Sequence, residues 1–112
     1  MKDSYLFIED MAGVMERLGG NEGLLRRLLT KFHDTYRDSR IKLFALLDTS
    51  DKEEAYRMVH SIKGVSANLG LARLSGLAAA LEKRMKAGEF ASMQKETEAF
   101  LTELETVVTE LE

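Results

Sequence analysis

The 112-residue chain contains no cysteine, no proline and no tryptophan. Without cysteine it can form neither a disulfide nor a cysteine-ligated zinc site, and this absence is compatible with a reducing compartment. No apolar run approaches the roughly 20 residues that a membrane-spanning helix needs, and residues 1–5 lack the basic and then apolar pattern of a signal peptide. We therefore expect a cytoplasmic domain without direct membrane contact.

An excess of positive charge is also lacking. The 16 lysines and arginines are outnumbered by 19 aspartates and glutamates, so the net charge of −3 does not favour a nucleic-acid partner. Neither a glycine-rich phosphate loop nor a kinase signature is present, so we do not expect the chain to bind ATP. The hydrophobic share of 45 % and the charged share of 31 % are ordinary for a globular protein, and the length predicts a single domain over residues 1–112.

The residues that are abundant favour helix, and several glycines lie where helices would end. Alanine, leucine, glutamate and lysine have high helix propensity, and Gly70 and Gly88 follow long periodic stretches as helix stops. Ser50 and Glu53 match the capping box that opens a helix. We predict a short helix over about residues 8–18 and four longer helices over about 21–47, 50–69, 71–87 and 89 to the C-terminus.

Each long segment carries one apolar stripe with steps of three and four residues. The stripes are Leu25, Leu29, Phe32, Tyr36, Ser39, Leu43 and Leu46; Ala55, Val59, Ile62, Ser66 and Leu69; Leu74, Ala78, Leu81 and Met85; and Phe90, Met93, Thr97, Phe100, Leu104, Val107 and Leu111. Amphipathic helices joined by short connections pack antiparallel. The predicted fold is all-α, an antiparallel up-down four-helix bundle with a short additional N-terminal helix. A bundle of this size can close its own core, so we expect a monomer.

His60 lies outside the apolar stripe of its helix. At 100° per residue it is about 120–130° from the centre of the stripe, on a flank that faces solvent. Lys63 and Gly64 share that flank, because positions i, i+3 and i+4 are neighbours on a helix. A glycine within a helix costs up to about 1 kcal/mol relative to alanine. Since Gly64 points away from the core, we expect it to allow close approach by a partner.

The grouping of His60 and Lys63 is suited to phosphoryl chemistry. Imidazole is a nucleophile near neutral pH, and attack on phosphorus would give phosphohistidine. Lys63 would then stabilise the phosphoryl oxygens as a point charge. The other histidine, His33, adjoins a core position without a lysine-glycine companion, and we interpret it as a surface or boundary residue. Two distant histidines do not make a metal site.

The segment from Ala55 to Glu82 resembles the histidine-containing phosphotransfer (HPt) domains of multistep two-component phosphorelays. The resemblance consists of a His-x-x-Lys-Gly motif, a small-residue segment, an Asn-x-Gly motif and a leucine-rich helix ending in Leu-Glu. These features correspond to His60, Lys63, Gly64, Ser66, Ala67, Asn68, Gly70, Leu74, Leu81 and Glu82. The N-terminal half is also similar, from Leu18-Gly19-Gly20-Asn21 into the helix that contains Phe32.

The resemblance implies that His60 accepts the phosphoryl group on Nε2, Lys63 stabilises it and Gly64 clears room for the partner. It implies response-regulator receiver domains as partners, with Mg²⁺ on the receiver and no cofactor or metal in this chain. An upstream sensor histidine kinase is implied as well. From the helical angle alone, Tyr56, Arg57 and Ala67 are candidates for the partner surface. The implied role is that of a phosphoryl carrier and not of an enzyme.

Alternatives of a different class remain open at this stage. The chain fits an HPt-like domain of a larger hybrid or chemotaxis-type kinase, in which case it would be a cytoplasmic domain of a membrane-bound sensor. It also fits a helical interaction module without chemistry. The dimerisation domain of a sensor kinase fits less well, because that family has an acidic residue after the histidine and a proline soon afterwards. Here Ser61 follows His60, and proline is absent.

Overall fold

The computed structural model describes residues 5–112, so residues 1–4, to which the prediction of no signal peptide refers in part, lie outside the description. The described residues form helices and connecting turns without a strand, as the sequence predicts. The helices are α1 (Met11–Arg17), α2 (Glu22–Tyr36), α3 (Ser39–Asp48), α4 (Lys52–Asn68), α5 (Ala72–Lys86) and α6 (Gln94–Glu110), with a 3₁₀ helix η1 (Phe90–Ser92) before α6. The molecule is elongated, with extents of 42 × 23 × 20 Å.

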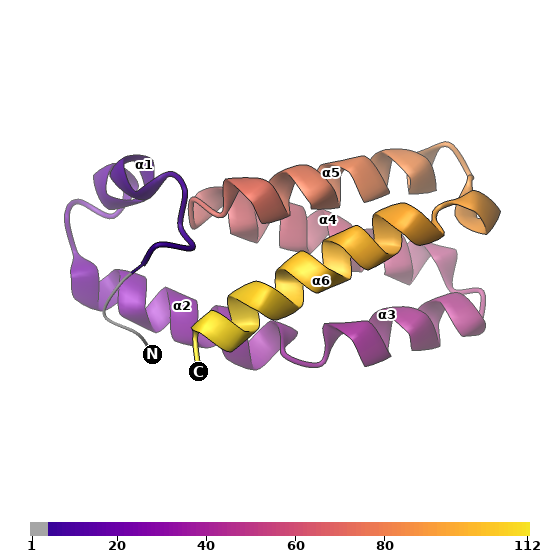
Figure 1. The fold of residues 1–112 in the computed structure, drawn as a ribbon, viewed down its shortest axis with the longest axis horizontal. Helices are drawn as coiled ribbons and strands as arrows, with labels where there is room; N and C mark the ends of the chain where they lie inside the picture. Colours follow the sequence, from indigo (N-terminus) through magenta and orange to yellow (C-terminus); the bar gives the residue numbers. More distant parts are fainter. Residues whose placement is uncertain (1–4) are drawn as a thin grey trace.

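The long helices pack against one another in pairs. Helix α4 packs against α5, α5 against α6, α3 against α4, and α2 against α6. In Figure 1, α2 and α3 follow one another along one side of the molecule, and α4, α5 and α6 then run back and forth. Helix α1 lies at the end of the molecule where α4 turns into α5. Helices α4 and α5 form the central pair, since α3 packs against α4 and α6 against α5.

The predicted apolar stripes form the core. All five stripe residues of α4 and all four of α5 are buried, as are the stripe residues of α6 from Met93 onward. Tyr36, Leu46 and Phe90 are only partly buried and pack against the edge of the core. Burial at every third or fourth position fixes the rotation of each helix about its axis, because the opposite face is left to solvent.

The prediction of one helix over residues 21–47 is wrong, because the chain breaks between α2 and α3 at Arg37 and Asp38. The Ser39 hydroxyl donates to the Tyr36 carbonyl at 2.7 Å, which offers that carbonyl a partner other than the next helical N–H. Aspartate and serine compete for backbone groups in this way and favour helix ends. The apolar stripe continues across the break, so hydrophobic periodicity alone does not reveal it.

The predicted capping box at Ser50 is also wrong. Asp51 caps α4, accepting a hydrogen bond from the Glu54 N–H at 3.2 Å. Ser50 instead follows the end of α3 in the left-handed region, with φ of 58°. The Asp51 N–H donates to the Leu46 carbonyl at 2.8 Å, which closes a Schellman motif around Ser50. A non-glycine residue therefore occupies a position that favours glycine.

The turn between α4 and α5 is clasped by the N-terminal segment. Gly70 has φ of 70°, and a Cβ there would lie 2.5 Å from Val14 Cγ2, so close packing requires glycine. The Glu9 carboxylate accepts from the Ala72 N–H at 3.0 Å and thereby caps α5 from far away in the sequence. Arg17 donates to the Asn68 carbonyl at 2.8 Å at the other side of the turn. These contacts help to hold the α4–α5 pair in register.

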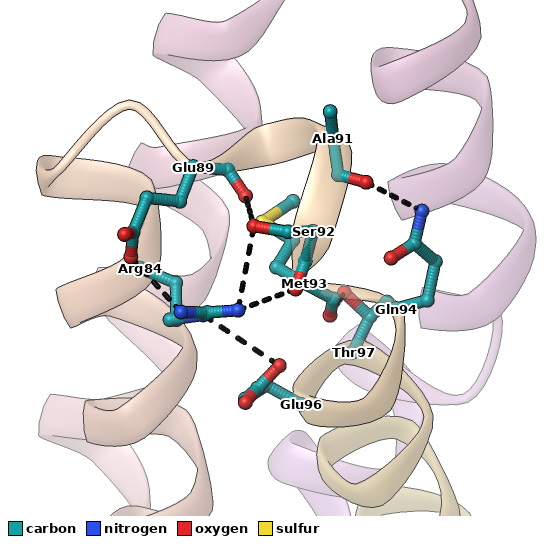
Figure 2. Close-up of polar contacts among 8 residues, drawn as sticks. All are labelled: Arg84, Glu89, Ala91, Ser92, Met93, Gln94, Glu96 and Thr97. Atoms are coloured by element: carbon teal, nitrogen blue, oxygen red, sulfur yellow. Dashed lines mark hydrogen bonds and ion pairs between the residues drawn. The ribbon is translucent and has the colours of Figure 1, made fainter.

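Arg84 organises the opposite end of α5, as Figure 2 shows. Its guanidinium donates to Glu89 Oε1 at 3.1 Å and to the Ser92 carbonyl, and its Nε lies 3.7 Å from Glu96 Oε1. The Gln94 side chain donates to the Ala91 carbonyl at 2.9 Å. The network ties the last turn of α5 to η1 and to the first turn of α6.

Candidate functional site

His60 lies near the middle of α4 with 57 % of its side chain exposed. The helical period predicts this outward position, since Val59 and Ile62 on the same helix are fully buried. The ring is nevertheless held, because its Nδ1 lies 2.6 Å from Glu82 Oε2 on α5. His60 thus combines an accessible ring with an orientation set by a neighbouring helix.

Glu82 is a buried carboxylate that joins His60 to Lys63. Only 6 % of its side chain is exposed, and its second oxygen, Oε1, accepts from Lys63 Nζ at 2.8 Å. Burial raises the pKa of the Glu82 carboxyl, but the hydrogen bonds with Lys63 and then His60 outweigh it, so that the pKa lies below its ordinary value. Glu82 is therefore ionised at neutral pH and can only accept hydrogen bonds.

This arrangement determines which ring nitrogen of His60 is available. A carboxylate cannot donate, so Nδ1 must carry the proton of the 2.6 Å contact. In the neutral ring the lone pair then resides on Nε2, which has no partner among residues 5–112. The geometry presents an oriented nucleophilic nitrogen to solvent, which is the requirement for accepting a group from another macromolecule.

The surface beside His60 is open. Gly64 is exposed, and a Cβ built on it would meet nothing within 4 Å. Ala67, one turn further along α4, is exposed as well, and so are Gly76 and Ala79 on α5. No side chain at Gly64 therefore obstructs the surface one helical turn from the imidazole, and another protein can approach it closely there.

Two of the predicted partner-surface residues contact other parts of the chain. The Tyr56 ring stacks on the imidazole of His60, with ring centroids 5.9 Å apart and an interplanar angle of 15°. Arg57 is exposed and pairs with Glu54 and with Glu53, the latter at 2.6 Å. Tyr56 therefore belongs to the immediate surroundings of His60, whereas Arg57 lies in an ion-pair cluster at the beginning of α4.

His33 differs from His60 in having both ring nitrogens engaged. Its Nδ1 lies 3.0 Å from Asp34 Oδ1, its Nε2 lies 3.2 Å from Glu112 Oε2, and its side chain is only 16 % exposed. The hydrogen bonds with Asp34 and Glu112 raise the pKa of His33 and favour the protonated ring. With both ring nitrogens engaged by carboxylates, His33 has no free nitrogen to act as a nucleophile.

The role of Glu82 as a bridge was missed from the sequence, where it stood only as part of the Leu-Glu motif. Glu82 follows Leu81 of the apolar stripe and is buried, which is rare for a glutamate without a partner. A charged residue next to the stripe was the available signal. The signal did not identify the partners, because His60 lies 22 residues away on a different helix.

A hollow formed by the described residues does not include His60. It has a volume of about 540 Å³ and lies between α1, α2 and the end of α4, with Leu28, Phe32 and Val65 among its lining residues. His60, with 57 % of its side chain exposed, lies at the surface outside this hollow, which suits a macromolecular donor better than a small substrate.

Comparison with protein-family models gives a match that covers nearly the whole chain. A family model described as Hpt domain matches residues 6–112, nearly the whole chain. No curated protein and no solved structure gives a significant match. No helix among residues 5–112 has the length and apolar character needed to cross a bilayer.

Proposed function

Because this chain belongs to the Hpt domain family, the histidine phosphotransfer modules of phosphorelays, we propose that His60 carries the phosphoryl group. The observation that carries the proposal is the difference between the surroundings of the two ring nitrogens of His60. Nδ1 is bound to the buried Glu82 carboxylate, and Nε2 faces solvent without a partner among the described residues. His33, with both nitrogens engaged, offers no comparable site.

The proposed step transfers a phosphoryl group from an aspartyl phosphate of a receiver domain. The lone pair of His60 Nε2 forms the N–P bond, the P–O bond to the aspartate breaks, and its electron pair remains on the aspartate carboxylate. The Nδ1 proton stays in place, so the ring becomes positively charged. The Glu82 carboxylate, 2.6 Å from Nδ1, stabilises that charge and favours the forward step.

We expect Lys63 to act at the same site through two of its N–H donors, one bound to Glu82 and one directed at the phosphoryl group. Its ammonium group has three donors, and one of them binds Glu82 Oε1 at 2.8 Å. The side chain is 32 % exposed, so a remaining donor can point toward the phosphoryl oxygens. Lys63 would thus keep Glu82 ionised and also lower the electrostatic cost of bringing the phosphoryl group to the ring.

The partner would dock on the open surface beside His60. Hpt domains interact with receiver domains and kinases in phosphorelays, and the absence of a side chain at Gly64 leaves room for such a partner. We propose that Gly64 and Ala67 lie under the receiver and that Tyr56 and Arg57 flank it. Mg²⁺ would belong to the receiver. The Lys63 ammonium lies beside His60, and Glu82 is the one carboxylate among residues 5–112 bound to the ring, so this site offers too few oxygen ligands for the metal.

The helices of the chain pack around one core, which favours a carrier made of a single domain. We propose that α2 and α3 together form one side of an up-down four-helix bundle, that residues 1–112 are a single HPt domain, and that it works as a monomer. Hpt domains are phosphoryl carriers and not catalytic enzymes, so we expect this chain to take its phosphoryl group from a partner and not from ATP.

Transfer of labelled phosphate from a phosphorylated receiver domain tests the assignment. We expect the wild-type chain to acquire label that is labile in acid and stable in base, as a phosphoramidate bond is. His60→Gln should acquire none, whereas His33→Gln, the matched control, should be labelled like the wild type. Label on His60→Gln would refute the assignment of the acceptor.

A further inference from the structure

Lys86 is a second cation at the site, after Lys63. It lies one turn after Glu82 on α5, with Nζ 3.7 Å from Glu82 Oε1 and 5.9 Å from the centroid of the Tyr56 ring. Contact with Tyr56 and then the charge of Glu82 raise the pKa of Lys86, so it is an ammonium at neutral pH. The same Tyr56 ring stacks on His60. Lys86 therefore lies next to Glu82 and Tyr56, the two residues that contact the imidazole of His60.

The two lysines at the site differ in how firmly they are held. Lys63 makes a hydrogen bond of 2.8 Å to Glu82, whose side chain is 6 % exposed. Moving Lys63 fully onto another anion would leave the buried carboxylate without its cation, which is costly. Lys86 is 62 % exposed, and its 3.7 Å contact with Glu82 is longer than a hydrogen bond. Because the Lys86 ammonium is mostly exposed and makes no hydrogen bond to Glu82, this contact contributes little, and Lys86 can exchange it for another anion.

Phosphorylation adds charge that Lys63 alone does not balance. A phosphoryl group carries about −1.5 to −2 charges at neutral pH, and Lys63 is already paired with Glu82. Among the other nearby cations, Arg57 is engaged by Glu53 and Glu54. Lys86 combines a position next to both Glu82 and Tyr56 with the freedom to move.

We propose that Lys86 is the mobile cation of this site. Once the phosphoryl group is on His60 Nε2, the Lys86 ammonium moves away from Glu82 and Tyr56 and binds the phosphoryl oxygens. Lys63 remains on Glu82 and holds the carboxylate in place. The inference rests on the acceptor role proposed for His60. Lys63 on α4 then stays in place while Lys86 on α5 moves, so the last turn of α5 becomes part of the phosphoryl site.

The mobility is confined to the side chain of Lys86. The backbone of the last turn of α5 is anchored by Arg84, which binds Glu89 and the Ser92 carbonyl (Figure 2). A fixed helix end with an exposed lysine allows the ammonium to change partners without rearrangement of the fold. The cost of the exchange is then mainly the ordering of one long side chain.

The test phosphorylates the protein with phosphoramidate, a small donor without a protein surface, so that receiver docking does not contribute. The ¹⁵Nζ and ¹H signals of both lysines are followed by NMR before and after phosphorylation. We expect the Lys86 signal to shift and to show a new hydrogen bond, and the Lys63 signal to shift less, because Lys63 keeps its hydrogen bond to Glu82. A shift of Lys63 with an unmoved Lys86 overturns the proposal.

Rates with a phosphorylated receiver provide the second measurement. We expect Lys86→Gln to slow transfer to His60 by about tenfold, as for loss of one hydrogen bond between charged groups, and Lys86→Arg to restore much of the rate. Lys83→Gln, which removes an exposed cation from the same turn, is the matched control and should transfer at the wild-type rate. Equal rates for Lys86→Gln and Lys83→Gln count against the proposal.

A wrong acceptor assignment for His60 and a wrong role for Lys86 would give different results. If phosphoramidate and the receiver leave His60 of the wild-type chain unlabelled, the acceptor assignment itself is wrong. If His60 is labelled but neither the Lys86 signal nor the Lys86→Gln rate changes, only the role of Lys86 is wrong. The unfolding midpoint and the protonation of His60 Nδ1 should be the same in all the lysine variants, which separates a phosphoryl contact from a structural effect.

Discussion

Replacing Glu82 with glutamine tests the central contact of the proposed mechanism with little change in size. The carboxylate accepts from His60 Nδ1 through one oxygen and from Lys63 Nζ through the other, at 2.6 and 2.8 Å. A glutamine amide has one acceptor oxygen and one NH₂ donor. In Glu82→Gln one of the two partners must therefore face a donor, and the negative charge that stabilises the phosphorylated imidazolium is lost.

The expected size of the effect follows from that lost contact. A hydrogen bond to a charged group contributes about 1.5–3 kcal/mol, which corresponds to a rate loss of roughly tenfold to a hundredfold. If the amide NH₂ turns toward His60, the ring adopts the other tautomer, and the proton moves to Nε2, where it blocks attack on phosphorus. The ring nitrogens of His60 should then report the change directly.

The assay combines rapid-quench phosphotransfer from a labelled receiver with ¹⁵N NMR of the His60 ring. Glu103→Gln is the matched control, because Glu103 is also a largely buried glutamate, paired with Arg73 at 3.1 Å, but on α6. We expect slow transfer and an altered tautomer in Glu82→Gln only. Wild-type transfer with an unchanged Nδ1 proton in folded Glu82→Gln would refute the reasoning.

Three further predictions concern stability and pH. Gly70→Ala should lower the free energy of unfolding by about 2–4 kcal/mol in urea denaturation, from left-handed strain at φ of 70° and from a Cβ 2.5 Å from Val14 Cγ2; near-wild-type stability would show that the clasp relaxes. Ser50→Gly should raise it by about 0.5–1 kcal/mol, because glycine tolerates φ of 58°; a loss would mean that the serine side chain is needed. The raised pKa of His33 predicts stabilisation that is fully present below pH 6.5 and is lost as the pH rises through the folded-state pKa. Comparison with His33→Gln across that range checks it, and a difference that persists at alkaline pH would contradict it.

The sequence predicted those parts of the molecule that depend on local periodicity. Helix rotation follows from the burial of every third or fourth residue, so the exposure of His60 and Gly64 could be derived from the stripe through Val59 and Ile62. The stop at Gly70 could be derived as well, since its φ of 70° favours glycine. The break after Tyr36 could not, because Ser39 continues the stripe while its hydroxyl competes for a backbone carbonyl.

By itself, then, the sequence determined that the chain is helical, which face of each helix is buried, and that an imidazole, an ammonium group and a glycine share an exposed flank. These features depend on neighbours within one helix, whose spacing is set by 3.6 residues per turn. Only the tertiary structure decided that α5 places a buried carboxylate between His60 and Lys63 and brings Lys86 beside them. The register of one helix against another depends on side-chain packing and on the clasped turn at Gly70, and no periodicity along a single helix specifies it.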